Sequence, residues 1–139
     1  MKTIDLIVGS DHRGLELKDK LLDYVSPDDI NGTTLFDIAV IQNLKPHEAG
    51  TSVDYPDVVK DMGYHFDKDN YGILVCGSGY GVSIAANRFK NMRAVVCRTP
   101  KEAEMARRHN NANVLCLGAD FTTKSQAKKI VKTFFTCLL

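Results

Sequence analysis

The chain has 139 residues, of which 44% are hydrophobic and 25% are charged, values that are typical of a globular domain and outside the range of disordered or membrane chains. Its 18 Lys and Arg residues nearly cancel its 17 Asp and Glu residues, so the chain lacks the positive field that would attract nucleic acid or an anionic membrane. Any anion that it binds must therefore be held by local groups.

In chain order, short apolar runs alternate with helical patterns, which is typical of β-α-β units and a parallel sheet covered on both faces. We predict strands at Ile4–Val8, Thr34–Asp37, Gly72–Cys76, Ala94–Cys97 and Val114–Leu117, and helices at Leu15–Tyr24, Pro56–His65, Val82–Asn87, Lys101–Arg108 and Lys124–Phe135. The segment 26–54 has the least regular pattern and is a candidate surface insertion. The sequence thus predicts one α/β, doubly wound domain, 1–139, with a five-stranded parallel sheet and a ligand site beyond the carboxyl ends of its strands.

The start of the chain is a short apolar run that Asp5 interrupts, too short and too charged for a signal-peptide core or a membrane-spanning helix. Four cysteines are separated by about twenty residues each, without the close pairs of zinc sites or redox C-x-x-C motifs. They are Cys76, Cys97, Cys116 and Cys137. We expect free thiols in a reducing compartment, and hence a cytoplasmic protein.

Three segments concentrate polar residues and glycine, and we expect them to follow strands and to share one edge of the sheet. They are G-S-D-H-R-G at Gly9–Gly14, C-G-S-G-Y-G at Cys76–Gly81 and R-H-N-N-A-N at Arg108–Asn113. Gly77, Gly79 and Gly81 would let the backbone approach a ligand and direct N–H groups at an anion, although such a turn can be purely structural. The run matches neither the G-x-G-x-x-G dinucleotide fingerprint nor a P-loop.

Cys76 stands just before the glycine run, where a new helix is expected to begin. A helix N-terminus favours the thiolate, which makes Cys76 a candidate base or nucleophile, whereas a buried hydrophobic role is the alternative. Asp11 could simply cap the first helix, and His109 could simply interact with a helix dipole. A thiol, two histidines, a carboxylate, amides and a glycine loop on one edge nevertheless favour a catalytic site.

The sequence resembles the ribose-5-phosphate isomerase B and galactose-6-phosphate isomerase family from Gly9 to about Gly118. The resemblance is carried by S-D-H-R-G-L-E-L-K at Ser10–Lys18, D-Y-P-D at Asp54–Asp57, C-G-S-G-Y-G-V-S-I-A-A-N-R at Cys76–Arg88, M-R-A at Met92–Ala94 and H-N-N-A-N-V-L at His109–Leu115. It implies a Rossmann-like subunit and a homodimer, or a dimer of dimers, with sites at the subunit interface. It also implies aldose–ketose isomerisation of a sugar phosphate without a metal or another cofactor.

The resemblance also implies roles for individual residues. Cys76 would be the base that moves a proton between C1 and C2, with the Ser78 hydroxyl beside it. His109 would open the furanose ring, and Asp11 would contact the ring oxygen or a hydroxyl. Two further residues would bind substrate, His12 at the phosphate and Asn110 at sugar hydroxyls. The N–H groups around Gly77, Gly79 and Gly81 would stabilise the enediolate.

The chain departs from this family at four places. Arg13 stands where a small residue is usual, Ser78 where Thr is usual, and Asp120 where an arginine is usual. Family members also have a basic C-terminal segment whose arginines bind phosphate, whereas this sequence ends in F-F-T-C-L-L. We therefore expect either a truncated sequence or a phosphate held by His12, Arg13 and other local groups.

The predicted function is conversion of ribose 5-phosphate to ribulose 5-phosphate. The alternatives are allose or galactose 6-phosphate as substrate, a catalytically weak sugar-phosphate binding protein, and a redox-sensing thiol protein that uses Cys76. Retention of Cys76, Asp11, His109 and Asn110 favours the enzyme, because a binding protein has little use for a base and a ring-opening group together.

Overall fold

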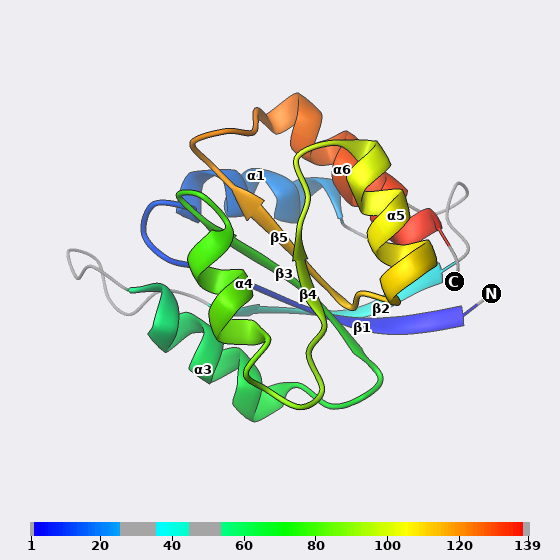
Figure 1. The fold of residues 1–139 in the computed structure, drawn as a ribbon, viewed down its shortest axis with the longest axis horizontal. Helices are drawn as coiled ribbons and strands as arrows, with labels where there is room; N and C mark the ends of the chain where they lie inside the picture. Colours follow the sequence, from blue (N-terminus) through cyan, green and yellow to red (C-terminus); the bar gives the residue numbers. More distant parts are fainter. Residues whose placement is uncertain (1, 26–35, 45–53, 138–139) are drawn as a thin grey trace.

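The computed structural model describes residues 2–25, 36–44 and 54–137. Strands and helices alternate as the sequence predicts, from β1 near the start of the chain to α6 near its end (Figure 1). The elements are β1 (Lys2–Ser10), α1 (Leu15–Tyr24), β2 (Phe36–Leu44), α3 (Tyr55–His65), β3 (Asn70–Cys76), α4 (Tyr80–Ala86), β4 (Ala94–Val96), α5 (Pro100–Asn110), β5 (Val114–Gly118) and α6 (Lys124–Thr136).

The five strands form one sheet in the order β2-β1-β3-β5-β4, and every neighbouring pair is parallel. Helices α1, α5 and α6 pack on one face, and α3 and α4 pack on the other (Figure 1). All seven residues of β3 are buried, because a central parallel strand has helices over both faces. The predicted doubly wound α/β class is confirmed.

Side chains close to the helix ends explain where α5 and α6 begin. Thr99 precedes α5 and its side chain accepts the N–H of Glu102 at 3.1 Å, while Pro100 occupies the first turn, where a missing N–H costs nothing. Thr123 caps α6 in the same way, accepting the N–H of Gln126 at 3.2 Å. These caps place the start of α5 one residue before the prediction.

Strand β2 differs from the prediction of a short strand at Thr34–Asp37. The structure has a nine-residue strand, Phe36–Leu44, that pairs with β1. The apolar pattern is interrupted by the polar residues Gln42 and Asn43, so the sequence alone does not indicate a strand there. The pairing with β1 shows that the chain stays extended as far as Leu44. Residues 26–35 and 45–53 of the predicted surface insertion lie outside the described residues, and so does Thr34, the predicted first residue of the strand, which falls in the first of these ranges.

The strand order decides which loops meet at the carboxyl edge of the sheet. Strand β3 lies between β1 and β5, so the loops that follow all three strands are neighbours. Backbone hydrogen bonds connect them: Asp11 N–H to Val75 O at 3.2 Å, and Ala119 N–H to Cys76 O at 2.8 Å.

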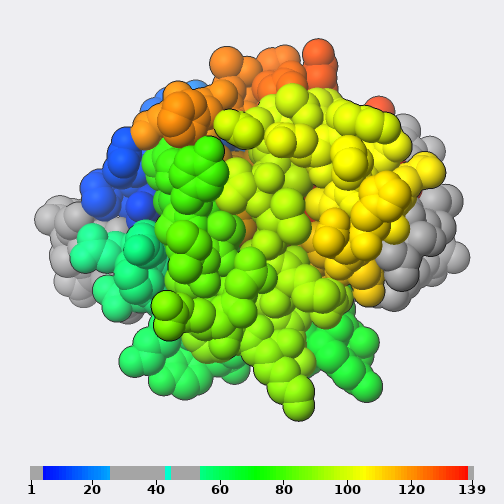
Figure 2. Space-filling model, viewed as in Figure 1, coloured from blue at the N-terminus to red at the C-terminus, as the bar shows by residue number. Residues whose placement is uncertain are grey.

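On the face shown in Figure 2, the segment around β4 separates α4 from α5. Within the described residues, no helix is long and apolar enough to cross a membrane.

Candidate active site

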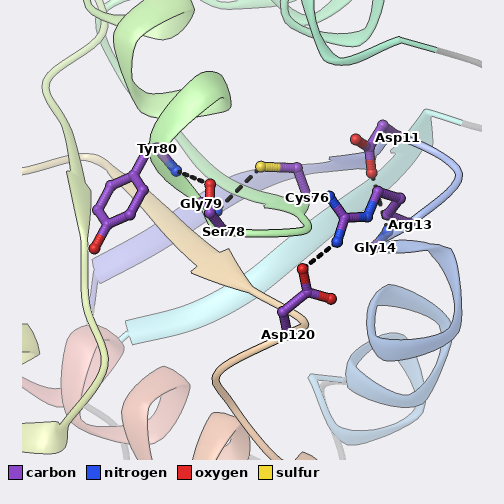
Figure 3. Close-up of polar contacts among 8 residues, drawn as sticks. All are labelled: Asp11, Arg13, Gly14, Cys76, Ser78, Gly79, Tyr80 and Asp120. Carbon is purple, nitrogen blue, oxygen red and sulfur yellow. Dashed lines mark hydrogen bonds and ion pairs between the residues drawn. The ribbon is translucent and has the colours of Figure 1, made fainter.

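Cys76 is the last residue of β3, and its sulfur accepts a hydrogen bond from the loop that follows (Figure 3). The Gly79 N–H donates to Cys76 Sγ at 3.1 Å, and the cysteine is only 4% exposed. Gly79 has a φ of +86°, a left-handed conformation that glycine adopts without steric cost. A donor directed at sulfur stabilises a thiolate, so this geometry suits a base.

The other cysteines have different surroundings. Burial raises the pKa of Cys97 to about 12 and raises that of Cys116 well above its ordinary range, so both are neutral thiols. Both side chains are fully buried in the core and pack there as small hydrophobic residues. Cys137 is only partly buried.

The glycine loop is held by its own side chains. The Ser78 hydroxyl accepts the N–H of Tyr80 at 3.2 Å, in the same turn in which Cys76 accepts from Gly79. Helix α4 begins at Tyr80, two residues earlier than predicted, so Gly81 belongs to the helix. A Cβ atom at Gly81 would overlap the ring of Tyr55 in α3, which gives this glycine a packing role.

Asp11 lies in the loop after β1, is 7% exposed, and holds that loop closed. Its Oδ1 accepts the N–H of Gly14 at 3.0 Å. The predicted structural alternative is thus partly correct, although the residue at the N-cap of α1 is Gly14 and not Asp11. The next side chain, His12, is exposed.

Two charged residues at which the sequence departs from the family pattern, Arg13 and Asp120, are paired at this edge. Arg13 Nη2 donates to Asp120 Oδ2, which connects the loop after β1 to the loop after β5 (Figure 3). Their opposite charges at post-strand positions were the available sequence signal. Their proximity could not be inferred without the order of β1, β3 and β5.

His109 and Asn110 do not lie at the edge that carries Cys76, which corrects the prediction for Arg108–Asn113. They end α5, and this segment precedes β5 rather than following a strand. The start of β5, Val114, pairs with Gly72, whereas Cys76 pairs with Gly118 at the other end of the strand. Four residues at the parallel-strand rise separate the two ends by about 13 Å.

The physical reason is the direction of α5. A helix that returns antiparallel to the strands carries its last residues back to their amino ends, here on the side of the chain's N-terminus (Figure 1). His109 and Asn110 are both exposed there. Within one chain the structure therefore unites Asp11, His12, Cys76 and Ser78, and separates them from His109 and Asn110.

The last asparagine of H-N-N-A-N has a structural role. Asn113 is 2% exposed; its Oδ1 accepts the Arg93 N–H at 2.7 Å and its Nδ2 donates to Asn91 O at 2.8 Å. Asn111 ends α5 with a φ of 47°. In the described part of the chain, no group of three or more His, Cys, Asp or Glu side chains is arranged to hold a metal ion.

The comparisons with known proteins agree with this fold. A family model described as Ribose/Galactose Isomerase matches residues 6–138. A probable ribose-5-phosphate isomerase B of Mycoplasma genitalium is 37% identical over 136 residues, covering 95% of this chain and 83% of the relative.

Two solved structures cover the whole of this chain. Ribose 5-phosphate isomerase B from Anaplasma phagocytophilum has a TM-score of 0.85 and 35% identity, with 90% of its chain covered. The Mycoplasma genitalium enzyme with bound ribulose-5-phosphate has a TM-score of 0.81 and 34% identity, with 88% covered. The Rossmann-like fold and these matches define the protein as an aldose–ketose isomerase that acts on sugar phosphates. The chain belongs to the ribose/galactose isomerase family.

Proposed function

We propose that this protein converts ribose 5-phosphate to ribulose 5-phosphate, as one isomerase domain that uses no metal or other cofactor. The observation that carries the proposal is the Gly79 N–H directed at Cys76 Sγ, at the carboxyl end of the central strand. The substrate is supported by the Mycoplasma genitalium relative, whose solved structure holds ribulose-5-phosphate.

In the proposed reaction, the Cys76 thiolate removes the proton from C2 of the open-chain aldose and returns it to C1. The electron pair of the broken C–H bond moves into a C1–C2 double bond, and the carbonyl oxygen becomes an enediolate oxygen. The C2 hydroxyl proton passes to O1, and O2 becomes the ketose carbonyl as C1 takes the proton back from Cys76. N–H groups of the loop Gly77–Gly81 stabilise that charge, with the Ser78 hydroxyl beside the reacting carbons. One oxygen of Asp11 holds Gly14, which leaves the other for the ring oxygen or a hydroxyl, and His12 binds the phosphate.

A second copy of the chain completes the site in this proposal. Ring opening and hydroxyl binding are assigned to His109 and Asn110, which lie at the opposite edge of the sheet from Cys76. A two-fold dimer can place the carboxyl edge of one copy against the amino edge of the other. Exposed apolar side chains on α3 and α4 support an interface on that face: Tyr64 is 76% and Ile84 63% exposed. The assembly is therefore a homodimer or a dimer of such dimers.

Allose 6-phosphate and galactose 6-phosphate are the alternative substrates, and the family description itself includes galactose. A sugar-phosphate binding protein is less well supported, because it would have little use for a thiol at the start of the glycine loop with a backbone donor directed at its sulfur. The redox-sensor alternative requires an accessible thiol, whereas Cys76 is 4% exposed. The four free cysteines support the proposed cytoplasmic location.

The test is ribulose 5-phosphate formation together with exchange of the substrate C2 proton with solvent. We expect Cys76→Ala to lower both by about 10³-fold, the scale of a lost general base, while its unfolding curve stays cooperative. Cys116→Ala is the matched control, because it removes a buried thiol from the same core cluster and should keep both activities. Undiminished proton exchange in Cys76→Ala would show that another group is the base.

A further inference from the structure

The guanidinium of Arg13 lies directly against the glycine loop. A Cβ atom at Gly77 would be 2.5 Å from both Cζ and Nη1 of Arg13, and 2.9 Å from its Nε. A permanent positive charge thus lies close to the residue that follows Cys76. Figure 3 shows the guanidinium between the loop that carries Asp11 and the side chain of Asp120.

Asp120 is well placed to fix the orientation of this guanidinium. Its own N–H donates to Gly77 O at 2.9 Å, so the Asp120 backbone is bound to the loop that Arg13 contacts. Its carboxylate oxygen Oδ2 accepts a hydrogen bond from Nη2 of Arg13. A long side chain with many rotamers is thereby held in one position, which lowers the entropy cost of using it to bind a ligand.

The remaining donors of Arg13 suit a phosphate. A guanidinium has five N–H donors in a planar fork, and the pair with Asp120 uses Nη2. Nη2 carries two N–H groups, one beside Nη1 and one beside Nε, so the pair with Asp120 leaves one two-donor edge of the guanidinium for two oxygens of a phosphate. The Arg13 and Asp120 side chains are 55% and 47% exposed, so a ligand can reach them from solvent.

We infer that Arg13 binds the phosphate group of the substrate and that Asp120 is a positioning residue that acts through Arg13. The inference rests on the proposed function and adds a specificity determinant to it. Arg13 follows β1 and Cys76 ends the neighbouring strand β3, so one sugar phosphate at this edge can contact both residues.

The test compares Arg13→Met with Arg98→Met. Arg98 is a matched control. Its side chain is also 55% exposed, and the side chain of its carboxylate partner, Glu102, is 41% exposed, close to the value for Asp120. We expect Arg13→Met to raise KM for ribose 5-phosphate by about ten- to a hundredfold, with a much smaller change in kcat, which is the scale of one charge-assisted contact to phosphate. Arg98→Met should keep the wild-type KM.

Inorganic phosphate provides a readout that does not depend on isomerisation. Its dissociation constant, measured by ³¹P NMR on the full chain, should rise in Arg13→Met by a factor similar to that in KM. An unchanged phosphate constant, or a fall in kcat at constant KM, would overturn the inference. If the wild type binds phosphate through Arg13 but forms no ribulose 5-phosphate, the proposed function fails and the phosphate contact stands.

Asp120 is tested by a double-mutant cycle. Asp120→Asn should raise KM for ribose 5-phosphate by less than Arg13→Met does, and should have no further effect when Arg13 is already Met. Equal effects of Asp120→Asn in both backgrounds would show that Asp120 does not act through Arg13.

Discussion

Hydrogen-bond direction distinguishes Cys76 from Cys97. Cys76 Sγ accepts an N–H, whereas Cys97 Sγ is a donor 4.0 Å from Val95 O. Burial penalises the charged form of Cys97 and raises its pKa to about 12. The same residue type thus lies beside a loop donor at Cys76 and in a purely packed setting at Cys97.

The raised pKa of Cys97 predicts alkaline sensitivity. Between about pH 9 and pH 12 the unfolded chain has released this proton while the native chain still holds it, so each increase in pH favours unfolding. One such thiol contributes a slope of about 1.4 kcal/mol per pH unit to the free energy of unfolding. That stability is complete below pH 9 and is lost toward pH 12.

Urea unfolding from pH 8 to 10.5 measures this slope. Cys97→Ala and Cys97→Ser both lack the titrating group and should both show a shallower loss of stability than the wild type. The two substitutions change packing and polarity differently, so their stabilities at pH 8 should differ while their slopes agree. A wild-type slope in either variant contradicts the assignment.

At the scale of elements, the end of α5 is anchored through one buried cation. Arg107 is 3% exposed and donates to Ala112 O, to the Tyr71 hydroxyl at 3.3 Å and to Cys137 O at 3.4 Å. Its guanidinium also stacks 5.2 Å from the Tyr71 ring centroid. The side chain therefore connects the end of α5 to β3 and to the end of α6.

Arg107→Ala should lower the free energy of unfolding by about 3 kcal/mol, because it leaves a cavity and several buried acceptors without a donor. Arg107→Lys should also destabilise, since an ammonium cannot reproduce a planar fork that both stacks and donates. Arg108→Ala, an exposed substitution one position along the same helix, should change stability by less than about 0.5 kcal/mol. Similar losses for Arg107→Ala and Arg108→Ala would exclude the anchoring role.

For the whole molecule, the separation of Cys76 from His109 predicts complementation between inactive chains. Cys76→Ala and His109→Ala should each be inactive toward the cyclic sugar. After co-refolding in equal amounts, half of the dimers contain both chains and carry one intact site, so roughly a quarter of the wild-type activity should return. Each variant refolded alone is the control.

The reciprocal mixture gives an independent outcome. Wild type refolded with an equal amount of the doubly substituted chain should retain roughly a quarter of the activity if sites are shared, and roughly half if each chain holds its own site. No recovery in the first mixture, with half of the activity in the second, would place His109 beside Cys76 in one chain. A monomer in sedimentation would contradict the shared site as well.

Local patterns in the sequence were sufficient for the features that depend on near neighbours along the chain. The spacing of apolar residues predicted α1 with its observed bounds, and strand β3 ends at Cys76 as expected. The glycine run after Cys76 indicated a tight loop because the requirement is local, and Gly79 with its positive φ realises it. The order of strands and helices along the chain was also sufficient to predict that Asp11 follows the first strand and that Cys76 ends a later one.

Contacts between distant segments were decided by the tertiary structure alone. The order β2-β1-β3-β5-β4 brings Arg13 to Asp120, 107 positions away in the sequence, and no periodicity encodes that order. The direction of α5 relative to the sheet, rather than the composition of H-N-N-A-N, sends His109 to the opposite edge from Cys76. Strand pairing also set the length of β2, because a backbone ladder with β1 stabilises an extended chain whatever its side-chain pattern.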